Sequence, residues 1–204
     1  MTRHLLLLLS LLTVACSSHP ERGGEPWNDT LKTELLTRVA NDQAVRERFS
    51  VAMRAGGVLD TSLIRELQAI DSANTEWLRI IVDRHGWPER DVVGADGASA
   101  AFLLVQHADR DTAFQAAMLP ALVAAFRRGQ AQGQSVALLT DRLAVARGEP
   151  QVYGSQASIT DGRVIFAPIA DSAGVDARRA EMGLPPLSEY RRVLDSVYLG
   201  RRVP

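Results

Sequence analysis

The chain has 204 residues, of which 46% are hydrophobic, and a formal net charge of −1 at pH 7. This length fits one well-buried domain and is short for two. Because acidic and basic residues are interspersed, the composition excludes the basic footprint of a nucleic-acid-binding protein and a basic membrane-binding face.

The N-terminus has the pattern of a signal peptide. A short positive region at residues 3–4 precedes an apolar core at residues 5–14. This core is about half as long as a membrane-spanning helix. The segment Leu12-Thr13-Val14-Ala15-Cys16 that ends it resembles the lipobox of bacterial lipoproteins.

We therefore expect residues 1–15 to be removed and Cys16 to be lipidated as the first mature residue. Residues 16–26 are polar and rich in Gly and Pro, which is typical of a tether. Ser17 stands where an Asp would retain the protein in the inner membrane. We thus expect a cell-envelope protein, lipid-anchored to the periplasmic face of the outer membrane rather than to the inner membrane.

Apolar residues at helical spacing cover most of the remaining chain. Polar residues typical of helix starts suggest fresh starts at Asn41-Asp42 and at residues 71–74. We expect helices over residues 29–53, 60–70, 71–82, 98–110, 111–119, 135–147, 175–182 and 187–199, with Pro120 either kinking its helix or opening a new one that runs to Arg128.

The predicted helix at residues 98–110 is hydrophobic on every side, and such a helix is buried. Gln106 and His107 lie near its end, followed by Asp109. A buried polar group without a partner costs about 1–3 kcal/mol. We therefore expect polar side chains from other segments to meet Gln106 and His107.

From Gln151 onward the hydrophobic period changes to two. Residues 151–159 and 164–167 flank Asp161-Gly162, which predicts a β-hairpin with a tight turn. Since an isolated hairpin is marginal in water, it is expected to pack on helices. The predicted fold is a mostly α, single helical domain of about six to eight helices, with one small β-hairpin near the C-terminal third.

Several polar motifs occur in order along the chain. They are Asp42-Gln43 with Arg46; Asp71 with Asn74-Thr75; Gly86-Trp87-Pro88; Gln106-His107-Ala108-Asp109 with Gln115; Asp141-Arg142; Gln151 with Tyr153-Gly154-Ser155-Gln156; Asp176 with Arg178-Arg179; and Gly183-Leu184.

Together these motifs resemble a bacterial family of domains of unknown function, number 6624, over roughly residues 31–190. The chain departs from the family pattern at Ser155, where the family usually has Thr. The resemblance implies no particular enzymatic activity or ligand. It implies only which polar positions belong together.

Known catalytic templates are mostly missing from the sequence. There is no H-E-x-x-H motif, and only His85 and His107 lie in the predicted folded region, so we expect no metal site and no cofactor. Ser155 lies in a hairpin strand rather than at a strand-to-helix turn. A Ser155–His107–Asp triad therefore depends on the fold bringing these residues together.

Each polar position also has a simpler interpretation. A histidine at the end of an apolar helix, such as His107, is most often a core residue with its hydrogen bonds satisfied. Asp71 is a plausible helix N-cap. Asp42 and Arg46 lie one turn apart and fit a surface ion pair.

Three hypotheses for the function follow. The first is an envelope module that binds a small molecule or an envelope component, with no nucleic-acid partner and membrane contact only through the lipid anchor. The second is a hydrolase with His107 as general base, with Asp109 and Ser155 as further catalytic candidates. The third is a closed structural network. The binding candidates are Gln106, Asp141, Arg142, Gln151, Tyr153, Gln156, Asp42, Arg46, Asp71 and Asn74. In particular, His107, Arg142 and one of Tyr153 or Gln156 are predicted to lie within reach of each other.

Overall fold

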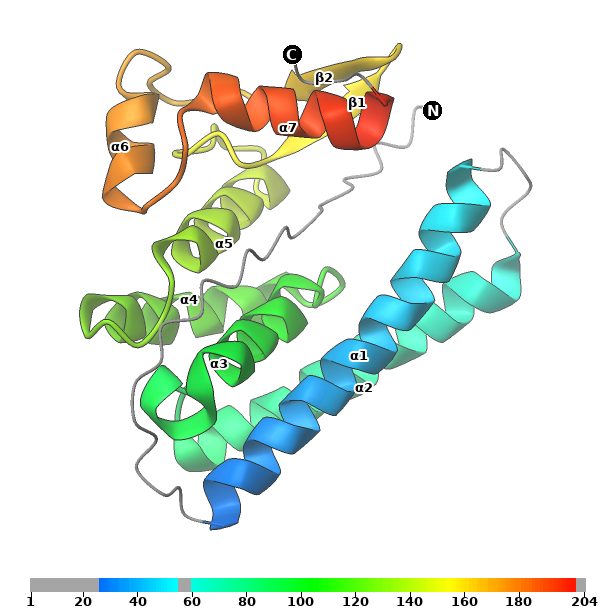
Figure 1. Ribbon diagram of the computed structural model, residues 1–204, viewed down its shortest axis with the longest axis vertical. Coiled ribbons are helices and arrows are strands. Elements are labelled where there is room, and N and C mark those ends of the chain that lie inside the picture. Colours follow the sequence, from blue (N-terminus) through cyan, green and yellow to red (C-terminus); the bar gives the residue numbers. More distant parts are fainter. Residues whose placement is uncertain (1–25, 55–59, 201–204) are drawn as a thin grey trace. The chain divides into compact units, whose positions relative to one another are not determined.

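The computed structural model describes residues 26–54 and 60–200, which form seven helices and one two-stranded sheet (Figure 1). The mostly helical fold with one hairpin in the C-terminal third is confirmed. The signal peptide, Cys16 and the predicted tether up to residue 25 lie outside the described residues.

The described chain falls into two compact units, which we call the N-terminal unit (up to Ala131) and the C-terminal unit (from Gln132). Each is considered separately below. Whether the mature chain folds as the single domain that its length suggests stays a prediction.

The N-terminal unit contains four helices. They are α1 (Pro26–Arg54), α2 (Thr61–His85), α3 (Arg90–Gln106) and α4 (Thr112–Arg127). The two long helices α1 and α2 run side by side, and both pack on α3 (Figure 1). Leu31, Leu35 and Val45 of α1 are buried, as are Leu78 and Ile81 of α2, so apolar burial holds these helices together.

Two predicted helix restarts were wrong, because α1 continues through Asn41-Asp42 and α2 continues through residues 71–74. The side chains of Asp42 and Asp71 bind Arg46 instead of capping a helix. Around Asp71, the Ser72 and Thr75 hydroxyls donate to backbone carbonyls one turn earlier. Such bonds satisfy polar side chains without interrupting a helix.

The central helix α3 begins earlier and ends earlier than predicted. It begins at Arg90 and passes through a kink at Gly94, whose φ of 73° is left-handed. It ends at Gln106, and His107 is its C-cap, with the His107 N–H donating to the Leu103 carbonyl at 3.0 Å. The residues from Ala100 to Gln106 are all buried, which confirms a helix without a solvent face.

Asp111 caps α4, since its carboxylate accepts the Phe114 N–H at 2.8 Å. Pro120 lies inside this continuous helix, so no new helix opens there.

The C-terminal unit contains α5 (Gly133–Ala146), β1 (Ala157–Thr160), β2 (Arg163–Phe166), α6 (Val175–Glu181) and α7 (Leu187–Leu199). The turn residues Asp161 and Gly162 have φ values of 50° and 67°, as a tight two-residue hairpin requires. The hairpin packs on α7 through β2 (Figure 1), so the predicted support by a helix is confirmed.

The first strand is shorter than predicted, because β1 begins at Ala157 rather than at Gln151. Residues 151–156 form a loop around the Asp141 carboxylate instead. The backbone N–H groups of Val152, Tyr153 and Ser155 bond to the Asp141 side chain of α5 rather than to a neighbouring strand.

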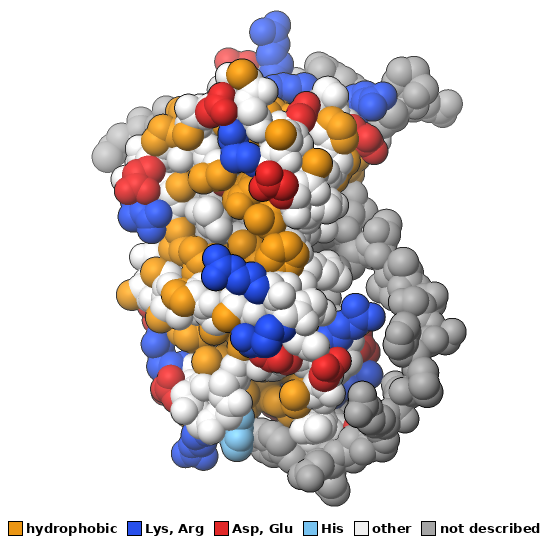
Figure 2. Space-filling model, turned by 90° about the vertical axis from the view of Figure 1, so that its left-hand side faces the viewer, with side chains coloured by type: hydrophobic (Ala, Val, Ile, Leu, Met, Phe, Trp, Pro, Cys, Tyr) orange, Lys and Arg blue, Asp and Glu red, His pale blue; other side chains and the backbone are white. Residues whose placement is uncertain are grey.

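Acidic and basic side chains lie intermixed on the face shown in Figure 2. Within residues 26–54 and 60–200, no helix combines the length and the apolar character that crossing a bilayer requires.

Candidate functional site

His107 pairs with a buried carboxylate of α1 in the N-terminal unit. His107 Nδ1 lies 2.8 Å from Asp42 Oδ2, although the two residues are 65 positions apart in the sequence. Asp42 has no exposed surface and His107 is only 8% exposed. The expectation that a polar side chain from another segment meets His107 is therefore confirmed.

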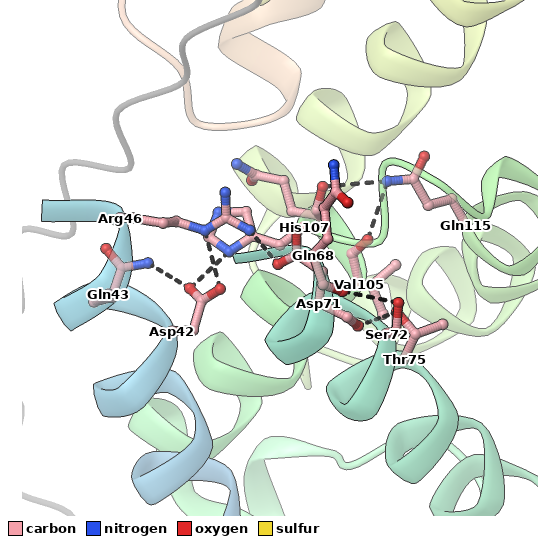
Figure 3. Close-up of polar contacts among 11 residues, drawn as sticks. Asp42, Gln43, Arg46, Gln68, Asp71, Ser72, Thr75, Val105, His107 and Gln115 are labelled. Atoms are coloured by element: carbon pink, nitrogen blue, oxygen red, sulfur yellow. Dashed lines mark hydrogen bonds and ion pairs between the residues drawn. The ribbon is translucent and has the colours of Figure 1, made fainter. Parts of the chain in front are cut away.

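Arg46 bridges Asp42 to a second carboxylate, Asp71 of α2. Its Nε donates to Asp42 Oδ1 at 2.9 Å, and its Nη2 donates to Asp71 Oδ1. Gln43 Nε2 adds a further hydrogen bond to Asp42 Oδ2 at 2.9 Å. Figure 3 shows Gln43, Arg46 and His107 gathered around the Asp42 carboxylate. The predicted Asp42–Arg46 ion pair is confirmed, but it is not a surface pair, because Asp42 is completely buried.

These contacts hold Asp42 ionised. Burial alone favours the neutral acid, but the hydrogen bond and charge of His107 together with the charge of Arg46 outweigh it. The pKa of Asp42 therefore lies below its ordinary value.

Asp71 behaves in the opposite way. Burial raises its pKa to about 6, with help from the negative charges of Asp42 and Asp109, and Arg46 only partly opposes this. Its role as an N-cap is ruled out, since it lies in the middle of α2. A carboxyl group with a strongly displaced pKa beside a cleft is a candidate functional group.

Asp71 also lines a pocket of about 290 Å³ in the same unit. The other lining residues come from α2 and from the segment after α3: Ser72, Thr75, Glu76, Arg79, Ala108, Arg110 and Asp111. Ala108 directly follows His107 in the chain. The pocket thus lies at the end of a chain of polar contacts that runs from His107 through Asp42 and Arg46 to Asp71. We call these four residues the acid–base cluster.

The remaining candidates of this unit lie around the cluster. Asn74 is buried and accepts a hydrogen bond from Arg38 at 3.2 Å. The Gln115 amide donates to the carbonyls of Val105 and Gln106 at the end of α3. Gln106 is 1% exposed, and among the described residues neither of its side-chain amide atoms has a hydrogen-bond partner, so the prediction that another segment meets this side chain was wrong.

In the C-terminal unit, Asp141 organises the loop of residues 151–156. Its carboxylate accepts the N–H groups of Val152, Tyr153 and Ser155 at 2.7, 2.9 and 2.8 Å. The neighbouring Arg142 of α5 is buried as well. Such charge-assisted bonds are stronger than neutral ones, so Asp141 fixes the loop conformation.

Side-chain amides close the same loop. Gln151 Nε2 donates to the carbonyls of Gln156 and Ala167, and its Oε1 accepts the Gln156 N–H. The hydroxyl of Ser155, which is 3% exposed, accepts a bond from Gln156 Nε2 at 3.0 Å. These contacts support the loop conformation. They do not test the catalytic role of Ser155, which stays a prediction.

Two arginines of α6, absent from the candidate site residues, complete the support of the loop. Arg178 Nε donates to the Val152 carbonyl at 3.0 Å, and Arg179 Nη1 donates to the Tyr153 carbonyl at 2.7 Å. The motif of Asp176 with Arg178-Arg179 in the sequence could have identified both arginines as candidate site residues. The pocket residues Arg79 and Arg110 had no such signal, because each resembles an ordinary charged surface residue.

The two polar centres lie in different units: the acid–base cluster in the N-terminal unit and Asp141 in the C-terminal unit. The predicted proximity of His107 to Arg142 and to Tyr153 or Gln156 stays a prediction, as does the Ser155–His107 pairing. Among the described residues, no group of three or more His, Cys, Asp or Glu side chains is placed to hold a metal ion.

Searches of curated proteins and of solved structures return no match. A family model described as a family of unknown function, DUF6624, matches residues 29–203. The chain therefore belongs to the DUF6624 family.

Proposed function

We propose that this protein is an envelope lipoprotein whose N-terminal unit binds a small polar molecule in the pocket beside Asp71. One observation carries the proposal: the acid–base cluster continues from the buried Asp42–His107 pair to a carboxyl group on the pocket wall. The lipobox-like segment that ends at Cys16 supports the envelope location.

The energetic cost of the cluster supports a functional role. Withdrawing an ion from water costs several kcal/mol, and apolar residues of similar volume are often as stabilising as a buried ion pair. Asp71 adds a further cost, because its ionised form is disfavoured in its surroundings. A network that served packing alone would gain from losing this carboxyl group.

The exposure of the acid–base cluster to a pocket favours the binding proposal over the hypothesis of a closed structural network. A closed network has all its members sealed inside the protein, whereas the Asp71 side chain is 14% exposed and lines a pocket. Asp42, with no exposed surface, then serves to fix the groups behind that wall.

A ligand screen on the purified protein tests the proposal. Cell-wall fragments, sugars, peptides and metal ions are added to the wild type, to Asp71→Asn and to Asp83→Asn, which alters an exposed carboxylate on the same helix. A ligand at a hundred times its Kd stabilises the folded protein by about 2.7 kcal/mol.

We expect a compound that raises the Tm of the wild type and of Asp83→Asn but not that of Asp71→Asn. The NMR amide shifts it causes should fall on the pocket residues. Binding that shifts only amides away from the pocket would contradict the proposal, and so would a screen without a hit.

The second candidate function is a hydrolase. It is favoured by the 2.8 Å contact between His107 Nδ1 and Asp42, since a carboxylate that orients an imidazole is typical of general-base sites. A screen of ester, amide and glycoside substrates tests it. His107→Gln and Asp42→Asn should each lower kcat by about a hundredfold or more, in line with the contribution of general-base catalysis.

A further inference from the structure

We infer that the ligand of the Asp71 pocket carries a protonated amine, which pairs with the free oxygen of the Asp71 carboxylate. This inference rests on the proposed ligand-binding function and names its ligand class. It follows from which atoms on the pocket wall still lack a hydrogen-bond donor.

One oxygen of the Asp71 carboxylate accepts a hydrogen bond within the protein, and the other is available to accept one from a ligand. Oδ1 accepts from Arg46, whereas no described residue donates to Oδ2. Because Asp71 lines the pocket, its second oxygen is available to a ligand there.

The two hydroxyls on the wall add acceptors rather than donors. Ser72 Oγ donates its proton to the Gln68 carbonyl at 2.8 Å, and Thr75 Oγ1 donates its proton to the Asp71 carbonyl at 2.8 Å. A hydroxyl has one proton, so each of these oxygens is left with accepting capacity only. Glu76 adds a further carboxylate, with a side chain 70% exposed and a 3.8 Å approach to Arg79.

The donors on the wall are the guanidinium groups of Arg79 and Arg110. Arg79 donates to Asp111 Oδ2 at 2.6 Å and lies over the Phe114 ring at 4.7 Å. Asp111 in turn caps α4, so this pair forms part of the helix junction. Arg110, an exposed residue after α3, is the other cation on the wall. The acceptors therefore gather on the α2 side of the pocket, at Asp71, Ser72 and Thr75, and a ligand group seated beside Asp71 is complementary if it donates hydrogen bonds.

The charges around Asp71 favour a cationic donor. The titratable groups that face Asp71 are Asp42 and Arg46 of α1, Glu76 and Arg79 of α2, and His107, Asp109, Arg110 and Asp111 between α3 and α4. Burial raises the pKa of Asp71, and the charge of Arg46 only partly offsets the cost of ionising it. An ammonium group in the pocket would provide the missing charge and lower the pKa of Asp71.

The test uses three small probes of similar size: ethanolamine as the cation, ethylene glycol as the neutral control and glycolate as the anion. The carboxyl carbon of Asp71 is followed by ¹³C NMR across pH 4–8 in the wild-type protein with each probe. Ethanolamine remains protonated in this range, because alkylamines titrate at a pH of about 10. The probes are also titrated into Asp71→Asn and into the control Asp83→Asn.

We expect ethanolamine to move the Asp71 titration to lower pH, and ethylene glycol to leave it in place. The Kd for ethanolamine should be about tenfold weaker at pH 5 than at pH 7.5, because an acid with a pKa of about 6 is about one-tenth ionised at pH 5. Asp83→Asn should bind as the wild type does, and Asp71→Asn should not bind. The wild-type titration is informative even if Asp71→Asn does not fold.

An unchanged Asp71 titration in ethanolamine would overturn the inference, as would equal binding of ethanolamine to Asp71→Asn. If glycolate or ethylene glycol shifts the amides of the pocket residues and ethanolamine does not, the ligand class is wrong while the proposed binding function stands. If none of the probes shifts those amides and the broader screen also finds no ligand, both fail.

Discussion

Asp42 and Asp71 share the guanidinium of Arg46, yet their pKa values are displaced in opposite directions. His107 contributes to this difference, because its hydrogen bond and its charge lower the pKa of Asp42. Asp42 is thus held as an anion by His107 and Arg46, with a further hydrogen bond from Gln43. Asp71 shares one partner and is further disfavoured as an anion by the charge of Asp42 itself.

The change in stability caused by replacing Asp71 with Asn should be more favourable at neutral pH than in acid. A raised pKa contributes stability below about pH 4 that is lost as the pH rises through about 6. The shift from 3.8 to about 6 corresponds to at most about 3 kcal/mol. The Tm of Asp71→Asn minus that of the wild type should therefore increase between pH 4 and pH 7.5. A difference that stays constant over this range would contradict the prediction.

Replacing Asp42 with Asn should have the opposite pH dependence. Its lowered pKa contributes stability above about pH 4 that is lost as the pH falls through the pKa of the folded state. Breaking a buried ion pair by removing one partner costs about 3–5 kcal/mol, so urea unfolding at pH 7 should show a loss of this size.

Two comparisons control the Asp42 measurement. Glu47→Gln, an exposed position on the same helix, should change stability by less than about 0.5 kcal/mol. The loss in Asp42→Asn should shrink in acid. A loss that grows in acid would show that the ionised carboxylate is not what stabilises the fold.

In the C-terminal unit, Asp141→Asn should destabilise the loop of residues 151–156. The carboxylate accepts three backbone N–H groups, and an amide presents only one oxygen to them. We expect a loss of about 2–4 kcal/mol in urea unfolding, with faster hydrogen exchange at Val152, Tyr153 and Ser155.

Asp161→Asn is the matched control, because Asn tolerates the left-handed φ of 50° at this turn position. It should leave both stability and exchange nearly unchanged. Unchanged exchange in Asp141→Asn itself would mean that the carboxylate does not hold the loop.

Cys16→Ala should release the protein from the membrane or leave it unprocessed, because the thiol is the expected point of lipid attachment. Membrane fractionation and metabolic labelling with a fatty acid measure this. Membrane association that persists in the variant, with the lipid label retained, would show that the lipobox interpretation is wrong.

Local patterns in the sequence predicted those parts of the fold that local physics determines. The last helix was predicted over residues 187–199, which are the bounds of α7, since two prolines precede it and an apolar stripe runs along it. Asp161-Gly162 and Asp111 likewise act locally, as a turn and as a cap. Each of these features requires contacts only within a few residues.

The errors occurred where a tertiary contact replaced a local one. Asp71 looks like a helix cap in the sequence, but Arg46 of α1 binds it across two helices. The sequence identified His107 as a buried polar residue that needs a partner, but it named Arg142 and Tyr153 or Gln156 as the residues within its reach and did not single out Asp42. Only the packing of α1 on α3 selects Asp42.

The most direct test of the acid–base cluster is the pKa of Asp71, measured by ¹³C NMR of its carboxyl carbon in the wild type and in Asp42→Asn. We predict a midpoint at about 6 in the wild type. In Asp42→Asn the midpoint should be lower, because the neighbouring negative charge is gone and Arg46 is left to Asp71. A wild-type midpoint near the ordinary value of 3.8, or one that Asp42→Asn does not move, would contradict the account.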